Sequence, residues 1–152
     1  MNLLPRRSLL AVAAVVDIAH HARPAPIAAK TLAARHNLPP RHLETLLQVL
    51  VRASILKGVR GPRGGYELAR ERRKITVAEI IRAVSGAGQG NGEDGGEDDE
   101  SALVREVVVP AIEAATLAFL DRLEDITVED LCDSAQKHGV FGDSLPSYDF
   151  TI

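Results

Sequence analysis

The fold is decided by residues 38–66, which read LPPRHLETLLQVLVRASILKGVRGPRGGY. In the first half, leucines recur three and four positions apart, which predicts an amphipathic helix with one apolar stripe. The stripe consists of Leu43, Leu46, Leu47 and Leu50. The opposite face carries side chains that can hydrogen-bond, namely Arg41, Glu44, Thr45, Gln48 and Arg52.

The second half predicts a basic hairpin. A short strand over 56–60 is followed by a turn of glycine and proline and by a second strand that starts at Tyr66. Gly61, Gly64 and Gly65 are expected to fill tight or positive-φ positions. A polar-faced helix followed by a basic hairpin suits DNA, because a helix fits the major groove and a hairpin can reach the backbone or the minor groove.

The segments before this stretch predict two further helices. The first runs from about Arg7 to His21, and the second runs from Ile27 to His36 after Pro26, which suits the first turn of a helix. Asn37 suits the left-handed residue that ends a helix, and the proline pair at 39–40 opens the next helix, which continues to about residue 53. Two helices joined by such a tight turn form a helix-turn-helix, and its second helix is the recognition helix.

Further helices are predicted after the hairpin. Thr76 and Glu79 form a capping box for a helix that ends near Val84, and Thr127 caps another that runs to about Gln136. Residues 86–100 are rich in glycine and acidic residues, which predicts a flexible loop. We expect a mainly α fold with four parts: a winged helix-turn-helix head at 1–86, a flexible loop at 87–101, dimerisation helices at 102–138 and a C-terminal tail at 139–152.

A long helix is predicted over 102–125. Its apolar positions form a stripe that is longer than the head requires, so we expect it to pair with the same helix of a second chain. The alternative is that it folds back onto its own head. Pro110 is expected to kink this helix or to mark its true start, because proline lacks a backbone N–H.

Charge is divided unevenly along the chain. Residues 1–86 contain 15 lysines and arginines against 5 acidic residues, a net charge of +10, whereas residues 87–152 contain 3 against 16, a net charge of −13. This asymmetry indicates a head that binds a polyanion. The alternative is that the acidic part only keeps the chain in solution. Both interpretations are compatible with DNA binding, because the electric field that matters is local to the basic face.

The N-terminus imitates an export signal, since Arg6 and Arg7 precede an apolar run over 9–16. Asp17 interrupts that run and the helical pattern continues past it, so we expect an ordinary first helix, no membrane span and a cytoplasmic location. The single cysteine, Cys132, excludes an intrachain disulfide and suits a reducing compartment. We expect its side chain to be a buried apolar group rather than a redox switch.

No catalytic or metal site is predicted. The sequence shows no nucleophile–base pair, phosphate-binding loop or metal triad, so we do not expect an enzyme. The acidic loop lacks the spacing of a calcium-binding loop, and the histidines of the head form no recognisable zinc pattern with Cys132. We expect no metal and no cofactor.

Residues 59–66, VRGPRGGY, resemble the wing of the Rrf-two family of bacterial winged helix-turn-helix transcriptional regulators. This family includes the iron–sulphur cluster regulator, the nitric-oxide-sensitive repressor and the cysteine-metabolism repressor. The spacing from Leu43-Glu44 to the wing and the segment Ile126-Thr127-Val128 are also similar, and the resemblance covers roughly residues 6–136. It implies a homodimer whose long helices cross, with each recognition helix in a major groove of a palindromic operator and each wing near the minor groove.

The resemblance also implies contacts to DNA. Base contacts are implied for Arg41, His42 and Glu44, and a minor-groove contact is implied for Arg60. From charge and hydrogen-bonding capacity we add Thr45, Gln48 and Arg63, and as phosphate contacts Lys30, Arg35, Arg6 and Arg7. Two alternatives stay open: Glu44 pairs only with Arg41 on the same helix face, and Gln48 is plain solvated surface.

The chain departs from the family at the loop before the long helix. Sensing members hold an iron–sulphur cluster there with three cysteines, whereas this loop contains none, so we expect no cluster. We expect a DNA-binding regulator that acts as a repressor. The alternatives are a regulator of the same fold gated by a small molecule between head and long helices, a winged-helix module that binds protein, and a secreted or enzymatic protein. The polar, basic face of the recognition helix favours DNA.

Overall fold

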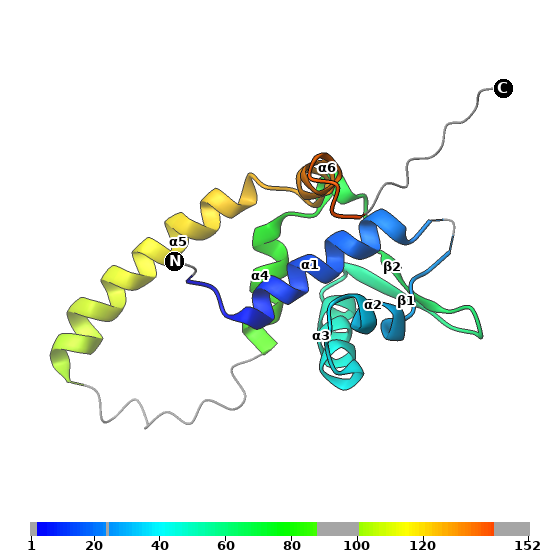
Figure 1. Cartoon of the computed structure of the whole chain (residues 1–152). Coiled ribbons are helices and arrows are strands. Elements are labelled where there is room, and N and C mark those ends of the chain that lie inside the picture. Colours follow the sequence, from blue (N-terminus) through cyan, green and yellow to red (C-terminus); the bar gives the residue numbers. More distant parts are fainter. Residues whose placement is uncertain (1–2, 24, 88–100, 142–152) are drawn as a thin grey trace.

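The computed structural model of the chain describes residues 3–23, 25–87 and 101–141. It confirms the mainly α fold, since these residues form helices and one two-stranded antiparallel sheet. Helix α1 (Arg6–His21) crosses the middle of the head, between α6 (Val128–Lys137) and α3 (Pro40–Arg52), whereas α5 (Val109–Glu124) extends away from the head (Figure 1). Each helix in the described part of the chain is too short or too polar to cross a bilayer.

The core is aliphatic and is built around α1. Apolar residues of α1 are buried where this helix packs on α4 (Val77–Ala87) and on α6. The predicted stripe of α3 is confirmed, because Leu43, Leu46, Leu47 and Leu50 are all at most 4% exposed. Burial of each leucine contributes about 2 kcal/mol, so the stripe fixes the rotation of α3 and turns its polar face outward.

Helix α2 (Ala29–Arg35) and α3 form the predicted helix-turn-helix. Asn37 has the expected left-handed conformation, with φ of 53°. The predicted start of α2 at Ile27 is wrong. Ile27 instead pairs with Tyr66, donating its N–H to the Tyr66 carbonyl at 3.0 Å and accepting the Tyr66 N–H at 2.8 Å. A β-branched residue beside an open strand edge gains this pairing, which outweighs the local helix signal of Pro26.

The wing is a hairpin of β1 (Leu56–Val59) and β2 (Gly65–Leu68). Gly61 has a φ of 116°, which side chains rarely tolerate. At Gly64 and Gly65 the constraint is space, because an added Cβ would lie 2.1 Å from the Val59 carbonyl oxygen and 2.3 Å from that of Ile27. These three glycines let the hairpin turn tightly and let its root lie directly against Ile27.

Helix α6 returns the chain to the head. Thr127 accepts the backbone N–H of Asp130, and the Asp130 carboxylate accepts the Thr127 N–H, which forms the predicted capping box. The Val128 N–H donates to the Ile75 carbonyl at 2.9 Å. Past α6, the ring of Phe141 stacks on His20 at 4.2 Å, while the other tail aromatics lie outside the described residues.

Helix α4 ends later than predicted, at Ala87 instead of near Val84. Its N-terminal cap is the predicted Thr76, whose hydroxyl accepts the Glu79 N–H at 3.2 Å. The helix continues past Gly86 because its apolar face is buried, and a glycine lowers helix stability by only about 1 kcal/mol. The predicted flexible loop at 87–101 falls almost entirely outside the described residues.

The long C-terminal helix contains a π-helical turn at Val104–Val108, and α5 follows it. Pro110, near the start of α5, marks this change as predicted. Proline has no N–H for the usual bond to the fourth preceding carbonyl, and the Val109 N–H reaches back five residues to the Val104 carbonyl. Helix α5 has no buried residues, so among the described residues it does not fold back onto the head.

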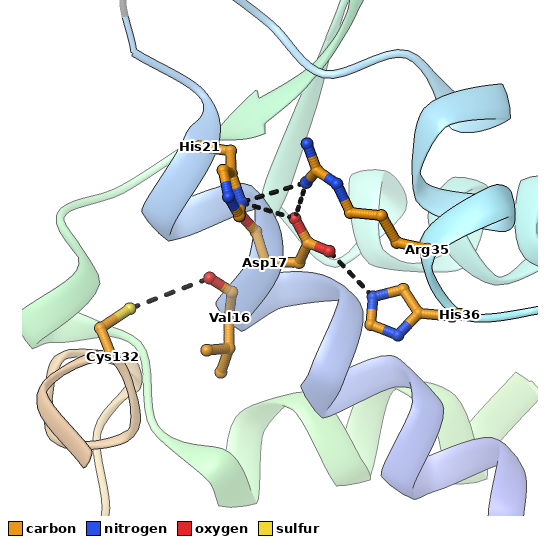
Figure 2. A network of polar contacts seen from close by, with 6 residues as sticks. All are labelled: Val16, Asp17, His21, Arg35, His36 and Cys132. Carbon is orange, nitrogen blue, oxygen red and sulfur yellow. Dashed lines mark hydrogen bonds and ion pairs between the residues drawn. The ribbon is translucent and has the colours of Figure 1, made fainter. Parts of the chain in front are cut away.

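A buried carboxylate joins α1 to α2. Asp17 is 2% exposed, and it accepts hydrogen bonds from the Arg35 guanidinium and, at 3.0 Å, from Nε2 of His36 (Figure 2). Nδ1 of His21 lies 2.8 Å from the same carboxylate. We call these four residues the Asp17 clamp. Since Arg35 and His36 end α2, the clamp fixes the chain just before it turns into α3.

We expect Asp17→Asn to lower the free energy of unfolding by about 1–3 kcal/mol, because an amide cannot hold the Arg35 guanidinium by charge. The partners of Asp17 are partly exposed and can be rehydrated, which limits the loss. Urea denaturation followed by circular dichroism measures it. The control is Asp133→Asn, an exposed position of α6 expected to change stability by less than about 0.5 kcal/mol. Equal effects of the two substitutions would contradict the role of the clamp.

Candidate nucleic-acid interface

The polar face of α3 is open to solvent. Arg41, His42, Glu44, Thr45 and Gln48 are all exposed, on the side of the helix opposite the buried leucine stripe. Arg52, in the last turn of α3, is exposed as well. The predicted face is therefore accessible along the whole helix.

Most polar side chains on this face are uncommitted. In the described part of the chain, Glu44 and Arg41 form no ion pair, so that alternative role for Glu44 is not realised in this structure. Thr45 differs, because its hydroxyl donates to the Arg41 carbonyl at 3.1 Å. Its oxygen can still accept a hydrogen bond, but its proton is already used. A carboxylate, a guanidinium and an amide with free hydrogen-bonding capacity match the edges of base pairs in the major groove.

The wing presents two further arginines. Arg60 directly follows β1 and Arg63 lies in the turn, and both side chains are exposed. A hydrogen bond closes the turn of the wing, because the Gly64 N–H donates to the Gly61 carbonyl at 2.9 Å. Two cations on a narrow glycine turn can approach phosphates or a narrow minor groove more closely than side chains on a broad surface.

The basic residues that flank α3 differ in whether a carboxylate already binds them. Lys30 is exposed in the first turn of α2, and Arg6 and Arg7 line a groove of about 450 Å³ together with His42 and Thr45. The structure thus brings the first turn of α1 beside the recognition helix. Arg35 differs from these residues, because its guanidinium is bound to Asp17. We therefore assign Arg35 a structural contact, and any contact with phosphate stays a prediction.

Cys132 lies on α6, where it is 3% exposed. Its thiol is 3.9 Å from the Val16 carbonyl oxygen (Figure 2). Burial raises the pKa of the thiol, which Arg72 opposes only in part. A buried thiol with a raised pKa is a weak nucleophile and a poor metal ligand, as expected of a cysteine that serves as an apolar packing group.

Sequence reasoning missed the residues that hold the reading face in place. In the sequence, Asp17 indicates only that the N-terminal apolar run is interrupted. Ile27 is predicted to start a helix, although the structure pairs it with Tyr66. A charged residue at a core position of an otherwise apolar helix face is a usable signal, since buried carboxylates require partners. The identity of those partners is not visible in the local pattern.

Together, a tight helix-turn-helix, a two-stranded glycine wing and an exposed basic face define a winged helix-turn-helix protein of the kind that binds DNA. Residues 4–134 match the model of the Rrf2 family, which is described as an iron-dependent transcriptional regulator. The chain belongs to this family and is a transcriptional regulator, not an enzyme.

Individual relatives agree with this assignment. The chain is 33% identical over 128 residues to slr0846 of Synechocystis sp., named as a transcriptional regulator of the helix-turn-helix type, and the match covers 84% of this chain and 86% of the relative. It is 39% identical over 82 residues to ORF2 of Azotobacter vinelandii, named as a regulator of the same type. That match covers 54% of this chain and only half of the relative's length. Among solved structures, IscR of T. potens has 29% identity and a TM-score of 0.67, over 98% of this chain and 95% of that one.

We expect Arg60→Ala to weaken binding to a cognate duplex by about tenfold and to reduce the salt dependence of binding by about one ion, because one guanidinium leaves the interface. Fluorescence anisotropy over a series of salt concentrations measures both quantities. Lys137→Ala removes another exposed cation, at the end of α6, and is expected to leave the affinity unchanged. Unchanged binding of Arg60→Ala would remove the wing from the interface.

Proposed function

We propose that the chain is a homodimeric repressor that reads a palindromic operator through α3 and the wing, and acts in the cytoplasm without an iron–sulphur cluster. The observation that carries this proposal is the exposed, uncommitted polar face of α3 beside the basic wing. Within it, Arg41, His42, Glu44 and Gln48 contact bases, Arg60 and Arg63 approach the minor groove, and Lys30 binds phosphate. A module that binds protein through α3 would need an apolar exposed face, and this face is polar.

Dimerisation is supported by the surface of α5 and the turn before it. Large apolar side chains on these segments are exposed, including Val107 at 58%, Ile112 at 62% and Leu117 at 67%. Helix α5 is attached to the head near its C-terminal end, where Glu124 accepts hydrogen bonds from Arg82 and from Thr76. A long apolar helix face that its own head leaves uncovered fits the same helix of a second copy.

We infer the absence of an iron–sulphur cluster from the number of cysteines in the chain. An iron–sulphur cluster is held by several thiolates, and this chain contains one cysteine in all. That cysteine is buried where α6 packs on the head, and burial raises the pKa of its thiol. The residues present therefore do not fit the group, and stoichiometric iron in anaerobically purified protein would contradict this part of the proposal.

We expect Ile112→Glu to convert the dimer into a folded monomer, because a charge at this position would have to be desolvated in the helix pair. Operator affinity should fall by at least about a hundredfold, since the two heads no longer bind together. Sedimentation equilibrium and anisotropy measure the two effects.

Glu113→Gln, the neighbouring position on the exposed surface of α5, is the matched control and should remain dimeric. If wild-type protein sediments as a monomer, or if Ile112→Glu remains a dimer, α5 is not the interface.

A further inference from the structure

The positive charge of the head is not confined to the face that reads DNA. A cleft of about 780 Å³ lies between the end of α1, the base of the wing, the short 3-10 helix Arg72–Lys74 and the start of α6. We call it the α1–wing cleft. It is lined by five lysines and arginines and by three glutamates, and its floor includes the apolar residues Ile18, Ala19 and Leu68. In Figure 1, α6 lies on one side of α1, and the wing strands and α3 lie on the other, with the wing nearer to the end of α1.

Several of these charges neutralise one another. Lys57 pairs with Glu67 at 3.0 Å, and Arg73 pairs with Glu71 at 2.6 Å. Arg70 pairs at 3.0 Å with Glu79, which is not part of the cleft lining. The pairs leave two cations, Arg23 and Arg72, against one carboxylate, Glu129, and none of these three forms an ion pair in the described part of the chain.

His20 lines the cleft, and Arg72 lies close enough to act on it. The pKa of His20 is lowered first by burial and then by the charge of His21; Asp17 opposes this shift, whereas Arg72 and Arg35 add to it. Arg72 also acts on the thiol of Cys132 behind the cleft. A guanidinium that influences both a histidine and a thiol, yet has no carboxylate partner, favours an anion beside it.

We propose that the α1–wing cleft binds a small organic anion, carrying carboxylate or phosphate groups, between Arg23 and Arg72, and that this anion is an effector of the regulator. The volume lies in the range of small-molecule sites, which combine an apolar floor with a few converging polar groups. This site differs from the one expected from the sequence, between the head and the long helices. The effector role rests on the proposed function, whereas binding of the anion does not.

The position of the cleft gives the anion a route to the reading face. Lys57, Glu67 and Leu68 belong to both strands of the wing, so a ligand touching them contacts the base of the element that carries Arg60. His20 lies with its ring 4.6 Å from that of His21, a member of the Asp17 clamp that holds the end of α2. An anion in the cleft therefore contacts the base of the wing directly and reaches the Asp17 clamp through His20 and His21.

The test uses the full chain without DNA at low salt, titrated calorimetrically with citrate and, separately, with pyrophosphate. At least one of them should bind at millimolar concentration or below, and the tighter of the two identifies the acid group. The double variant Arg23→Ala/Arg72→Ala should weaken that binding by about tenfold or more, because two charge-assisted contacts are lost. Lys137→Ala is the matched control and should bind like the wild type.

The outcomes separate the two proposals. If neither anion binds, or if Arg60→Ala weakens binding while the double variant does not, the cleft is not the site. If the anion binds in the cleft but does not change the affinity of the wild-type protein for DNA, the effector role is overturned. If the wild-type protein does not bind DNA in the absence of the anion, the proposed function is contradicted, whereas the proposal that the cleft binds an anion is not.

Discussion

Asp17 is the constraint on which the arrangement of the head depends. A carboxylate buried among aliphatic side chains costs several kcal/mol unless charged or polar donors surround it, and the donors here come largely from the end of α2. The contact therefore forms only when α2 lies at a defined angle across α1. Because α2 passes into α3 through the left-handed Asn37, the same contact orients the recognition helix. A buried core group thus sets the direction of the exposed polar face of α3.

The wing is held in a comparable way from the other end of α2. Ile27 exchanges two backbone hydrogen bonds with Tyr66, and Gly65 allows the two chains to approach closely. Helix α2 is thereby fixed at its start to the wing and at its end to α1. This double attachment fixes the position of α2 between α1 and the wing, and simultaneous contact with a major groove and its neighbouring minor groove requires such a fixed geometry. The α1–wing cleft is lined by residues at the base of the wing and by His20, whose ring contacts that of His21, so the effector we propose would act on the wing directly and on the Asp17 clamp through His21.

The parts of the structure that could be predicted from the sequence are those with local causes. The stripe of α3, the glycine turn of the wing and the capping box at Thr127 each depend on residues a few positions apart. The contacts of Asp17 with Arg35 and of Ile27 with Tyr66 join residues far apart in the chain, and no local pattern identifies such partners. For the same reason, the exposed face of α3 could be predicted, whereas the structural contact of Arg35 and the excess charge of the cleft could not. The contacts with DNA remain predictions from chemistry and resemblance.

We propose that two copies of α3 and of the wing, joined through α5, read a symmetric DNA sequence. Selection of bound sequences from a random duplex library tests this proposal, because it reports specificity, symmetry and spacing in one measurement. We expect an inverted repeat whose half-sites lie about one helical turn, ~10 base pairs, apart. Recovery of unenriched DNA, or of a single site without a repeat, would contradict it.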